Sequence, residues 1–481
     1  MSDNALVDRI NVMQGAQISG DTISNYLEAD ENGDLRLTHL TFGNKADENG
    51  NSTSVADSDF ALTYDGNITG KNLSLQINGG NTTLTGDHLL YNATIAQAGT
   101  LSGSGSYQIY SEELFRNEGI LNPSVAGQAI EINGNYLQSQ TGTLALSFNN
   151  QQDISSLIVN GTAGFDGTIS FAPERGWYQN GFSITSGDWI DAIDFDGDFS
   201  TVSTSRASPT LNASATHDGD NVYTVSLNRS DNAYSQYADS SNGRSVGSAI
   251  DNMGGNAAPQ LQSLIAALDF SAADGSTIRA ALPVLSSEAY ASASGVLVNA
   301  SGATRSAINN RLQQAFGGTP AAPVSVVAYA SAPQTHAAGN AINAPAPQPT
   351  ASNDMSRYAA WSAAYGSWSS QSANGNAGRT KSTLGGFSTG IDADVYDNWR
   401  LGAMAGYSRS TFKTASRNSS GSSDNYTLGV YGGTQWQTAA GSVGLRTGLA
   451  YSWHNLEMGR SVAFNGFSDS LSADYNAGTF Q

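Results

Sequence analysis

Five histidines are the first candidates for metal binding or catalysis in this sequence: His39, His88, His217, His336 and His454. None has a second histidine or a glutamate at the spacing that a zinc site uses. The sequence also contains no cysteine, which excludes thiolate metal sites, cysteine nucleophiles and disulfides. We therefore predict that the histidines are structural and that the protein needs no metal or other cofactor.

One His-Asp dyad and two acidic segments are the remaining candidates for catalysis or metal binding. His217-Asp218 lies near many serines, but no nucleophile elbow or oxyanion motif accompanies it, so a serine-hydrolase triad is the minor alternative. The segments Asp30–Asp34 and Asp194–Asp198 interleave acids with glycine, as calcium loops do, yet neither has the EF-hand register or its twelfth-position glutamate. Solenoid turns explain both segments better, so the sequence predicts neither an enzyme nor a calcium site.

Composition narrows the class of protein. The 481 residues carry a formal net charge of −20, which excludes a general nucleic-acid binder because phosphate recognition needs clustered cations. No run of about 18 apolar residues is present, so no transmembrane helix is expected. The 53 glycines, with frequent serine and tyrosine, favour extended β structure with many turns.

Short strand-like runs separated by Asn/Gly turns fill the first half of the sequence. Examples are Leu73–Ile77, Leu144–Phe148 and Leu157–Val159, and turns follow at intervals of about 10–20 residues. This pattern predicts a right-handed parallel β-helix, with residues 1–118 as one portion and 119–235 as its C-terminal, autochaperone-like β region. A β-sandwich remains the competing fold.

Bulky aromatic residues follow the most regular part of this pattern. A terminal solenoid coil exposes its core and an unpaired strand edge, so we expect these side chains to cap it. They are Trp177, Tyr178, Phe182 and Trp189.

A helical segment and a linker are predicted next. Residues 236–316 change to helical periodicity, and Ile308, Leu312 and Phe316 stand at steps of four on one face. Leu261, Leu264, Ile265 and Leu268 make a similar face earlier. Residues 317–356 are rich in Ala and Pro and read as a linker without a core.

Six amphipathic strands are predicted within residues 357–481. In Trp399–Tyr407 one face is apolar with an aromatic residue at each end, and the other is Arg, Gly and Met. Eight residues span about 26 Å, or about 20 Å of height at a tilt of about 40°, close to the apolar band of an outer-membrane barrel. The residues predicted to form its aromatic girdles are Trp361, Trp399, Tyr407, Tyr426, Trp436, Tyr451 and Trp453.

The connections between these strands alternate in length. Asp392–Asn398 and Gln437–Ser442 are short, whereas Ser370–Ser382, Phe412–Asp424 and Leu456–Gly466 are long and polar. In outer-membrane barrels short turns are periplasmic and long loops extracellular. The first strand is therefore expected to start on the periplasmic side, near Arg357.

The order of solenoid, capping segment, helix and barrel strands resembles a type V autotransporter with a pertactin-like passenger. Ser287–Ser292 resembles the segment before the translocator, and Trp361–Trp368, Gly385–Asp392 and Trp399–Ser408 resemble its first three strands. Leu428–Gly433 and Tyr451–His454 resemble the next two. The family implies a twelve-stranded barrel with a helix filling its pore and a passenger at the cell surface.

Two features of the ends depart from that family. Six strands are half of its barrel, and Gln481 is not the aromatic residue with which the family usually ends. The N-terminus also lacks the basic start and apolar core of a signal peptide. We therefore expect the sequence to be a fragment whose half barrel, with two unpaired edges, does not insert stably by itself.

Asn309-Asn310 lies on the predicted pore helix. In one subgroup of the family an Asn-Asn pair at such a place is the site of self-cleavage inside the barrel. The favoured interpretation is two polar residues facing lumen water, and passenger cleavage there is the alternative.

The resemblance implies a protein of the bacterial outer membrane that exports and displays its own passenger. Its implied partners are outer-membrane lipid, the barrel-assembly machinery and periplasmic chaperones, with no nucleic acid. A passenger that is an adhesin or aggregation factor, with an unknown host-surface or self-association ligand, is one alternative. Others are an enzyme domain upstream of Met1 and a soluble β-solenoid.

Overall fold

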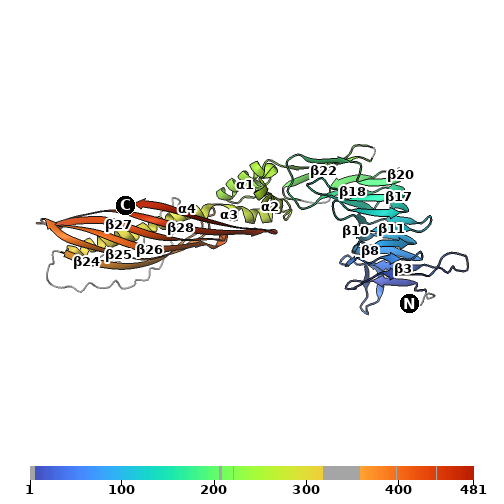
Figure 1. Cartoon of the computed structure of the whole chain (residues 1–481), viewed down its shortest axis with the longest axis horizontal. Coiled ribbons are helices and arrows are strands. Elements are labelled where there is room, and N and C mark those ends of the chain that lie inside the picture. The colour runs from blue at the N-terminus through green and yellow to red at the C-terminus, as the bar shows by residue number, and fades with distance from the viewer. Residues whose placement is uncertain (1–5, 205–207, 220, 318–357, 397, 440) are drawn as a thin grey trace. The chain divides into compact units, whose positions relative to one another are not determined.

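The computed structural model describes residues 6–204, 208–219, 221–317, 358–396, 398–439 and 441–481. Figure 1 shows two bodies, and the chain divides into two compact units that are described separately. The first comprises residues 1–233 with 252–274, and the second residues 234–251 with 275–481. The linker predicted at residues 317–356 lies outside the described residues beyond Gly317.

The first unit is a parallel β-helix, as predicted, and its parallel pairings exclude the β-sandwich. Its strands stack in three ladders within the described residues. The first contains β1 (Arg9–Val12), β3 (Thr38–Phe42), β8 (Leu73–Leu84), β10 (Asn92–Gly103), β12 (Leu114–Asn117), β15 (Asn135–Gln138), β17 (Ser156–Phe165) and β20 (Ile190–Gly197). The second joins the later parts of β8 and β10 to β6 (Ala61–Tyr64), β13 (Ile120–Asn122), β16 (Thr143–Phe148), β18 (Thr168–Pro173) and β21 (Thr201–Thr204). The third contains β2 (Thr22–Ile23), β7 (Ile68–Thr69), β9 (Asp87–Leu90), β11 (Ser106–Ile109), β14 (Ala129–Asn133) and the first parts of β17 and β20.

One coil of the helix takes about 20 residues in its middle part. Leu75 pairs with Ala93, Ala93 with Phe115, and Phe115 with Tyr136. The boundary predicted at residue 118 falls between β12 and β13 of the same coil, so the two predicted portions form one continuous solenoid. An antiparallel hairpin, β4 (Asn44–Ala46) and β5 (Ser52–Ala56), projects between coils.

Alternation along each strand buries one side chain in two, and the buried rings stack from coil to coil. Tyr107, Phe115, Tyr136 and Phe165 follow one another at centroid distances of 5.3, 6.0 and 5.7 Å. Such edge-to-face and tilted ring contacts stabilise beyond the area they bury. At the corner before the second ladder, Gly80 has φ +62°, and a Cβ there would collide with the Phe60 backbone, so this turn requires glycine.

The last coil is closed by a three-stranded antiparallel sheet of β19 (Phe182–Ser186), β22 (Leu211–His217) and β23 (Tyr223–Arg229), with α2 (Pro259–Asp269) beside it. As predicted, Tyr178, Phe182 and Trp189 are buried here, and the Trp189 ring lies 4.7 Å from that of Phe171. Trp177 is half-buried and donates its indole N–H to the Gly254 carbonyl at 2.7 Å.

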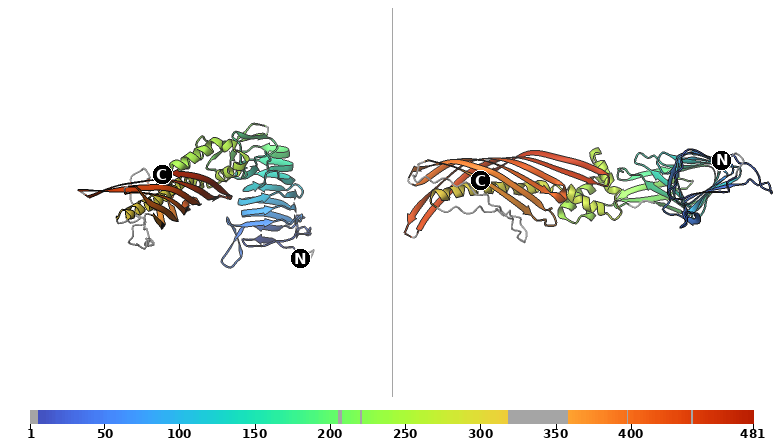
Figure 2. Two further views of the ribbon diagram at one scale, coloured as in Figure 1. Left: turned by 60° about the vertical axis from the view of Figure 1, so that its left-hand side comes forward. Right: turned by 90° about the horizontal axis from the view of Figure 1, so that it is seen from below.

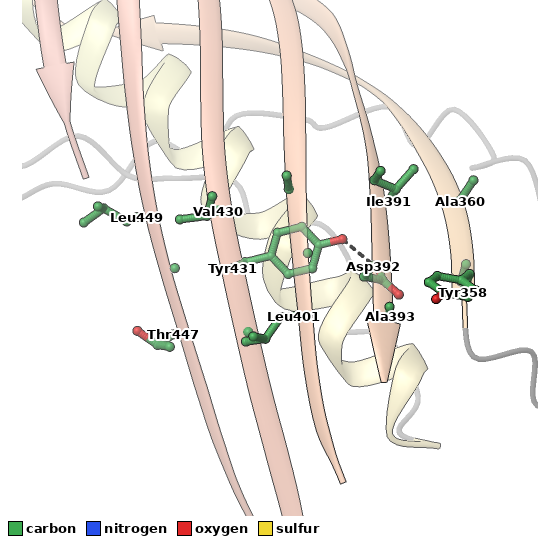
Figure 3. Close-up of a pocket in the computed structure, with 15 residues that line it drawn as sticks. Tyr358, Ala360, Ile391, Asp392, Ala393, Leu401, Val430, Tyr431, Thr447 and Leu449 are labelled. Carbon is green, nitrogen blue, oxygen red and sulfur yellow. Dashed lines mark hydrogen bonds between the residues drawn. The ribbon is translucent and has the colours of Figure 1, made fainter. Parts of the chain in front are cut away.

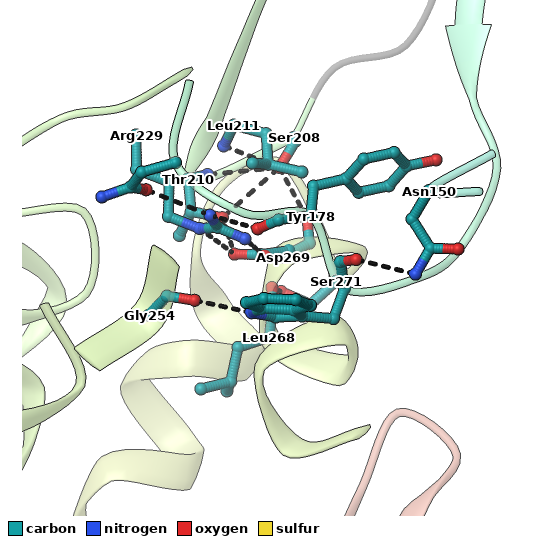
Figure 4. A network of polar contacts seen from close by, with 12 residues as sticks. Asn150, Tyr178, Ser208, Thr210, Leu211, Arg229, Gly254, Leu268, Asp269 and Ser271 are labelled. Carbon is teal, nitrogen blue, oxygen red and sulfur yellow. Dashed lines mark hydrogen bonds and ion pairs between the residues drawn. The ribbon is translucent and has the colours of Figure 1, made fainter. Parts of the chain in front are cut away.

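A buried ion pair fixes α2 to this cap. Figure 4 shows Arg229 of β23 directed at Asp269 at the end of α2, with a distance of 2.5 Å between Nη2 and Oδ2. Arg229 also donates to the Tyr178 carbonyl, and the Thr210 hydroxyl donates to Asp269 Oδ1 at 2.6 Å. Because both charges have several partners, the buried pair is satisfied and sets the position of the helix.

The second unit contains the C-terminal sheet and three further helices. The helices are α1 (Ser241–Met253), α3 (Ser276–Leu285) and α4 (Glu288–Ala315), with the short 3-10 turns η1 (Ser235–Tyr237) and η3 (Ala415–Arg417). A third such turn, η2 (Gly254–Asn256), belongs to the first unit. The six predicted strands are present in chain order as one antiparallel sheet. They are β24 (Tyr358–Gln371), β25 (Thr380–Tyr396), β26 (Trp399–Thr414), β27 (Ser419–Thr438), β28 (Gly441–Phe464) and β29 (Phe467–Phe480).

Two of the predicted long loops are wrong. Phe412–Asp424 and Leu456–Gly466 are largely strand, because β26 continues to Thr414 and β28 to Phe464. One face of these segments carries Phe412, Leu456 and Met458, but Thr414 and Arg460 interrupt it, so the hydrophobic alternation in the sequence is weak. Pairing continues through cross-strand contacts such as the 2.7 Å hydrogen bond between the Thr380 and Thr414 hydroxyls.

His88 makes the stability of the solenoid depend on pH. Its side chain is buried under Tyr107, its Nδ1 accepts the Ile68 N–H at 3.2 Å, and burial lowers its pKa to about 4. The unfolded chain, with an ordinary histidine pKa of about 6.5, therefore binds more protons between about pH 6.5 and 4. The free energy of unfolding should fall by about 2–3 kcal/mol as pH drops from 7.5 to 4.5.

Urea-dependent proteolysis of the solenoid at both pH values measures this loss. His88→Gln should remove most of the histidine-dependent change, whereas the exposed control His39→Gln should retain it. An equal pH dependence in the His88→Gln protein would show that another group is responsible.

Candidate functional site

Helix α4 lies along the concave face of the curved C-terminal sheet, as Figure 2 shows. It contacts β24 to β28, so one helix lines most of the inner surface of the sheet. None of the helices in the described part of the chain, α4 included, combines the length and hydropathy needed to cross a membrane.

The two faces of the sheet differ in chemistry. Along β27 the outward residues Tyr426, Leu428 and Val430 are about half exposed, whereas the alternating Thr427 and Tyr431 are buried on the side of α4. Across the strands, Ile391, Ala403, Val430 and Leu449 stand in register on the outer face. This outer band is apolar, and its hollow of about 1040 Å³ is lined mainly by alanine, leucine, isoleucine and valine (Figure 3).

Six of the seven predicted girdle residues point outward. Tyr407, Tyr426 and Trp453 form one cross-strand row with Phe387, and Trp399 pairs with Tyr396 nearer the short turns. Trp436 and Tyr451 are also exposed on this face. These positions are compatible with aromatic girdles, and their contact with lipid remains a prediction.

Trp361 corrects the girdle prediction, because it faces the helix. Its indole N–H donates to the Tyr431 hydroxyl at 2.5 Å, and its ring packs with Phe316 against Ile308 and Leu312 of α4. On the same strand Tyr358 and Trp368 are the large aromatic residues exposed on the outer face, at 70% and 53%. The sequence misled here because β24 carries aromatic residues on both faces.

A buried carboxylate fixes the C-terminal end of α4 to the sheet. Asp392 of β25 accepts two hydrogen bonds from Arg311 of α4, at 2.7 and 2.8 Å. Its oxygens also accept from Arg400 of β26 and from the Tyr431 hydroxyl of β27, the latter at 2.8 Å and drawn in Figure 3. The Asp392 side chain is fully buried, and Arg400 reaches a second carboxylate, Asp394, at 3.0 Å.

The opposite end of α4 is fixed by a second set of charges. Glu288, the first helical residue, pairs with Arg417 at 2.8 Å and accepts the Gly378 N–H at 2.7 Å. Arg460 of β28 donates to the carbonyls of Leu285 and Ser286, just before the helix. Between the two ends, Ala293, Val296 and Leu297 pack on Phe412, Leu456 and Met458. Thus α4 runs from the end of the sheet near Gly378 and Arg417 to the end where β25 connects to β26 and β27 connects to β28.

Most of these residues were not predicted as a site. Arg400 falls on the polar face of a strand that the sequence identified, which was an available signal for an inward-facing charge. Asp392 was assigned to the start of the short connection Asp392–Asn398, but β25 continues through it to Tyr396. Arg311 directly follows Asn310 on the predicted pore helix, and no pattern marked it as part of a site. Their meeting could not be read from the sequence, since Arg311 and Asp392 are 81 residues apart.

Of the described histidines, His88, His217 and His454 contact other residues of the fold, whereas His39 is exposed. His454 lies in the sheet wall, 2.6 Å from Asn425 and 2.8 Å from Thr479, and His217 stacks on Tyr223 and lies 3.4 Å from Asp198. Among the described residues no cluster of three metal-binding side chains occurs, and His336 lies outside them. Asp30 Oδ1 accepts two N–H groups of its own loop, as expected of a turn.

Comparison with known families identifies the C-terminal sheet. The family model of the autotransporter β-domain matches residues 360–481. These residues are an autotransporter β-domain. The resemblance to a type V autotransporter is thereby confirmed.

Two curated relatives share this region. Both are named "Extracellular serine protease" and come from Serratia marcescens, and they are 38% and 34% identical to this chain over 122 residues. Each match covers 25% of this chain and 11% of the relative. The similarity therefore lies in the translocator, and an autotransporter β-domain has an outer-membrane translocator function.

Removing the Asp392 carboxylate should release the end of α4. Asp392→Ala leaves Arg311 and Arg400 buried without their main counter-charge, which costs about 3–5 kcal/mol. Because the sequence has no cysteine, a single cysteine at Ala307, which is 8% exposed, reports on opening through its rate of maleimide labelling. We expect labelling at least about 100-fold faster in Asp392→Ala.

The matched control is Asp394→Ala, whose half-exposed carboxylate pairs only with Arg400 in the same cluster. It should change the labelling rate less than about fivefold. Equal rates in the two variants would contradict an anchoring role for Asp392.

Proposed function

We propose that this protein translocates and displays its own solenoid passenger at the bacterial cell surface. The observation that carries the proposal is the direction of α4. Its first residue is held by Gly378 and Arg417 at the end of the sheet where two of the three connections, 372–379 and 415–418, are the longer ones. Arg311 near its last turn is held at the end with the short turns. In outer-membrane barrels those ends are extracellular and periplasmic, respectively.

The direction of α4 has a consequence for the chain that precedes it. Segments before Glu288 leave the concave face at the extracellular end, and the solenoid is among them. The strands that follow start at Tyr358 from the periplasmic end. A chain with this route passes once through the lumen, as a passenger exported by its own β-domain must.

The partners and location follow from this function. We propose that the outer face of the sheet contacts outer-membrane lipid and that the barrel-assembly machinery and periplasmic chaperones act on the protein before insertion. The absence of cysteine suits a chain that crosses an oxidising periplasm unfolded.

Fractionation and protease access test the proposal. The full-length protein should be recovered with outer membranes and show heat-modifiable migration on denaturing gels. Added protease should remove the solenoid from intact cells while the β-domain remains protected. Recovery in the soluble fraction, or a solenoid cleaved only after lysis, would contradict it.

For the solenoid itself we propose a binding role, as an adhesin or self-association factor, with an upstream enzyme domain as the alternative. We favour it over hydrolysis in the described part of the solenoid because the His217-Asp218 dyad is engaged otherwise: His217 pairs with Asp198, and Asp218 accepts hydrogen bonds from Thr216 and Thr224. The serine-protease names belong to the relatives, whose similarity is confined to the β-domain.

We propose that Asn309 and Asn310 remain intact as polar residues of the lumen helix. Self-cleavage of asparagine needs an acid or base that holds its side chain, and the nearby Asp392 carboxylate already accepts four hydrogen bonds from Arg311, Arg400 and Tyr431. Asn309 is exposed and Asn310 half-buried.

A denaturing gel of outer membranes should therefore show one band containing both solenoid and β-domain. Asn309→Ala and Asn310→Ala should leave that pattern unchanged. A wild-type β-domain fragment beginning at residue 310, lost in either variant, would establish cleavage instead.

A further inference from the structure

A polar hollow of about 680 Å³ lies on the outer face of the sheet, where the strands extend beyond the aromatic row of Phe387, Tyr407, Tyr426 and Trp453. It is lined by β25 to β29 and has the size of a small-ligand site. The inward side chains behind it, such as Phe412 and Met458, pack on α4, so the floor of the hollow is fixed.

Two lysines form one end of this hollow. Lys381 of β25 and Lys413 of β26 stand directly opposite one another on the outer face, and both are exposed. They are two of the four lysines in the whole sequence. Like charges placed directly opposite across two strands destabilise a sheet, whereas an anion bound between them removes the repulsion. Arg379, also exposed, precedes Lys381 by two residues.

The other end of the hollow is hydroxylic and acidic. Ser420 and Ser422 of β27 follow the lysines, and Glu457 of β28 stands opposite Asp474 of β29. From the strand spacing Glu457 lies about 12 Å and Asp474 about 16 Å from Lys413, both beyond a Debye length of about 8 Å. A ligand for the whole hollow therefore carries negative charge at one end and hydrogen-bond donors such as hydroxyl groups at the other.

The distance of the two lysines from the aromatic row indicates which kind of lipid headgroup can reach them. Lys381 is six residues along β25 from Phe387, which is about 20 Å of strand and about 15 Å above the aromatic row at a tilt of about 40°. The headgroup layer of a phospholipid leaflet is only about 5–8 Å thick. A phosphate that meets these lysines belongs to a headgroup that extends further, such as a phosphorylated saccharide.

We propose that this hollow binds the phosphorylated saccharide headgroup of a glycolipid in the outer leaflet. Lys381 and Lys413 hold a phosphate by charge-assisted hydrogen bonds, and the serine hydroxyls with Glu457 and Asp474 bind sugar hydroxyls. The inference rests on the proposed function, since it requires that this end of the sheet face the outside.

Native mass spectrometry of the detergent-solubilised full-length protein tests the site. The probes are a truncated lipopolysaccharide with phosphorylated inner saccharides, the same molecule after dephosphorylation, and phosphatidylglycerol. The wild type should bind the phosphorylated glycolipid about 25-fold more tightly than the dephosphorylated one, from two lysines worth about fivefold each. The double variant Lys381→Gln/Lys413→Gln should bind the two glycolipids with equal affinity.

Lys45→Gln/Lys71→Gln is the matched control, because it removes the same charge from the solenoid. Its affinity for the phosphorylated glycolipid should equal that of the wild type. Equal binding of both glycolipids, equal binding of phosphatidylglycerol, or an unchanged affinity in the Lys381/Lys413 variant would overturn the proposal. Heat-modifiable migration, measured on every sample, reports separately whether the β-domain is inserted and folded. Loss of headgroup binding in a folded β-domain can therefore be distinguished from failure of the proposed function.

Discussion

The alternation of side chains along a β-strand is the constraint on which the C-terminal sheet depends. Each strand must present one row of side chains to a helix and the other to the outside. In β27 this places Leu428 and Val430 outward and Tyr431 against α4. A shift of one residue in register would exchange the two rows and separate Tyr431 from Asp392. The strand register therefore determines both the outer apolar band and the position of α4.

Buried ion pairs fix the position of α4 on the inner face of the sheet. The apolar contacts of α4 with the sheet allow sliding, because alanine and glycine are frequent in both. The Arg311–Asp392–Arg400 cluster at one end and the Glu288–Arg417 pair at the other remove that freedom. Buried ion pairs add little net stability but are costly to break, so they specify one arrangement of the helix. In the solenoid a buried ion pair has the same role, since Arg229 and Asp269 hold α2 on the cap.

Much of this architecture could be predicted from the sequence, since period-two alternation and turn residues are local signals. They identified the solenoid, the six strands and the helix containing Ile308 and Leu312. Trp361 was assigned to the wrong face because both rows of β24 contain aromatics, and only the contact with Tyr431 decides between them. The long strand extensions were missed because polar residues such as Thr414 and Arg460 interrupt the face that carries Phe412, Leu456 and Met458. The charge clusters join α4 to strands far along the chain, and no local pattern encodes such pairs.

Lipid exposure along β27 is the most direct test of the central claim that one face of this sheet meets the membrane and the other meets α4. Spin labels placed singly at residues 427 to 431 of the reconstituted full-length protein report collision rates with dissolved oxygen, which concentrates in lipid. The account predicts maxima at Leu428 and Val430 and minima at Thr427, Gly429 and Tyr431. A uniform profile, or maxima on the Tyr431 face, would contradict it.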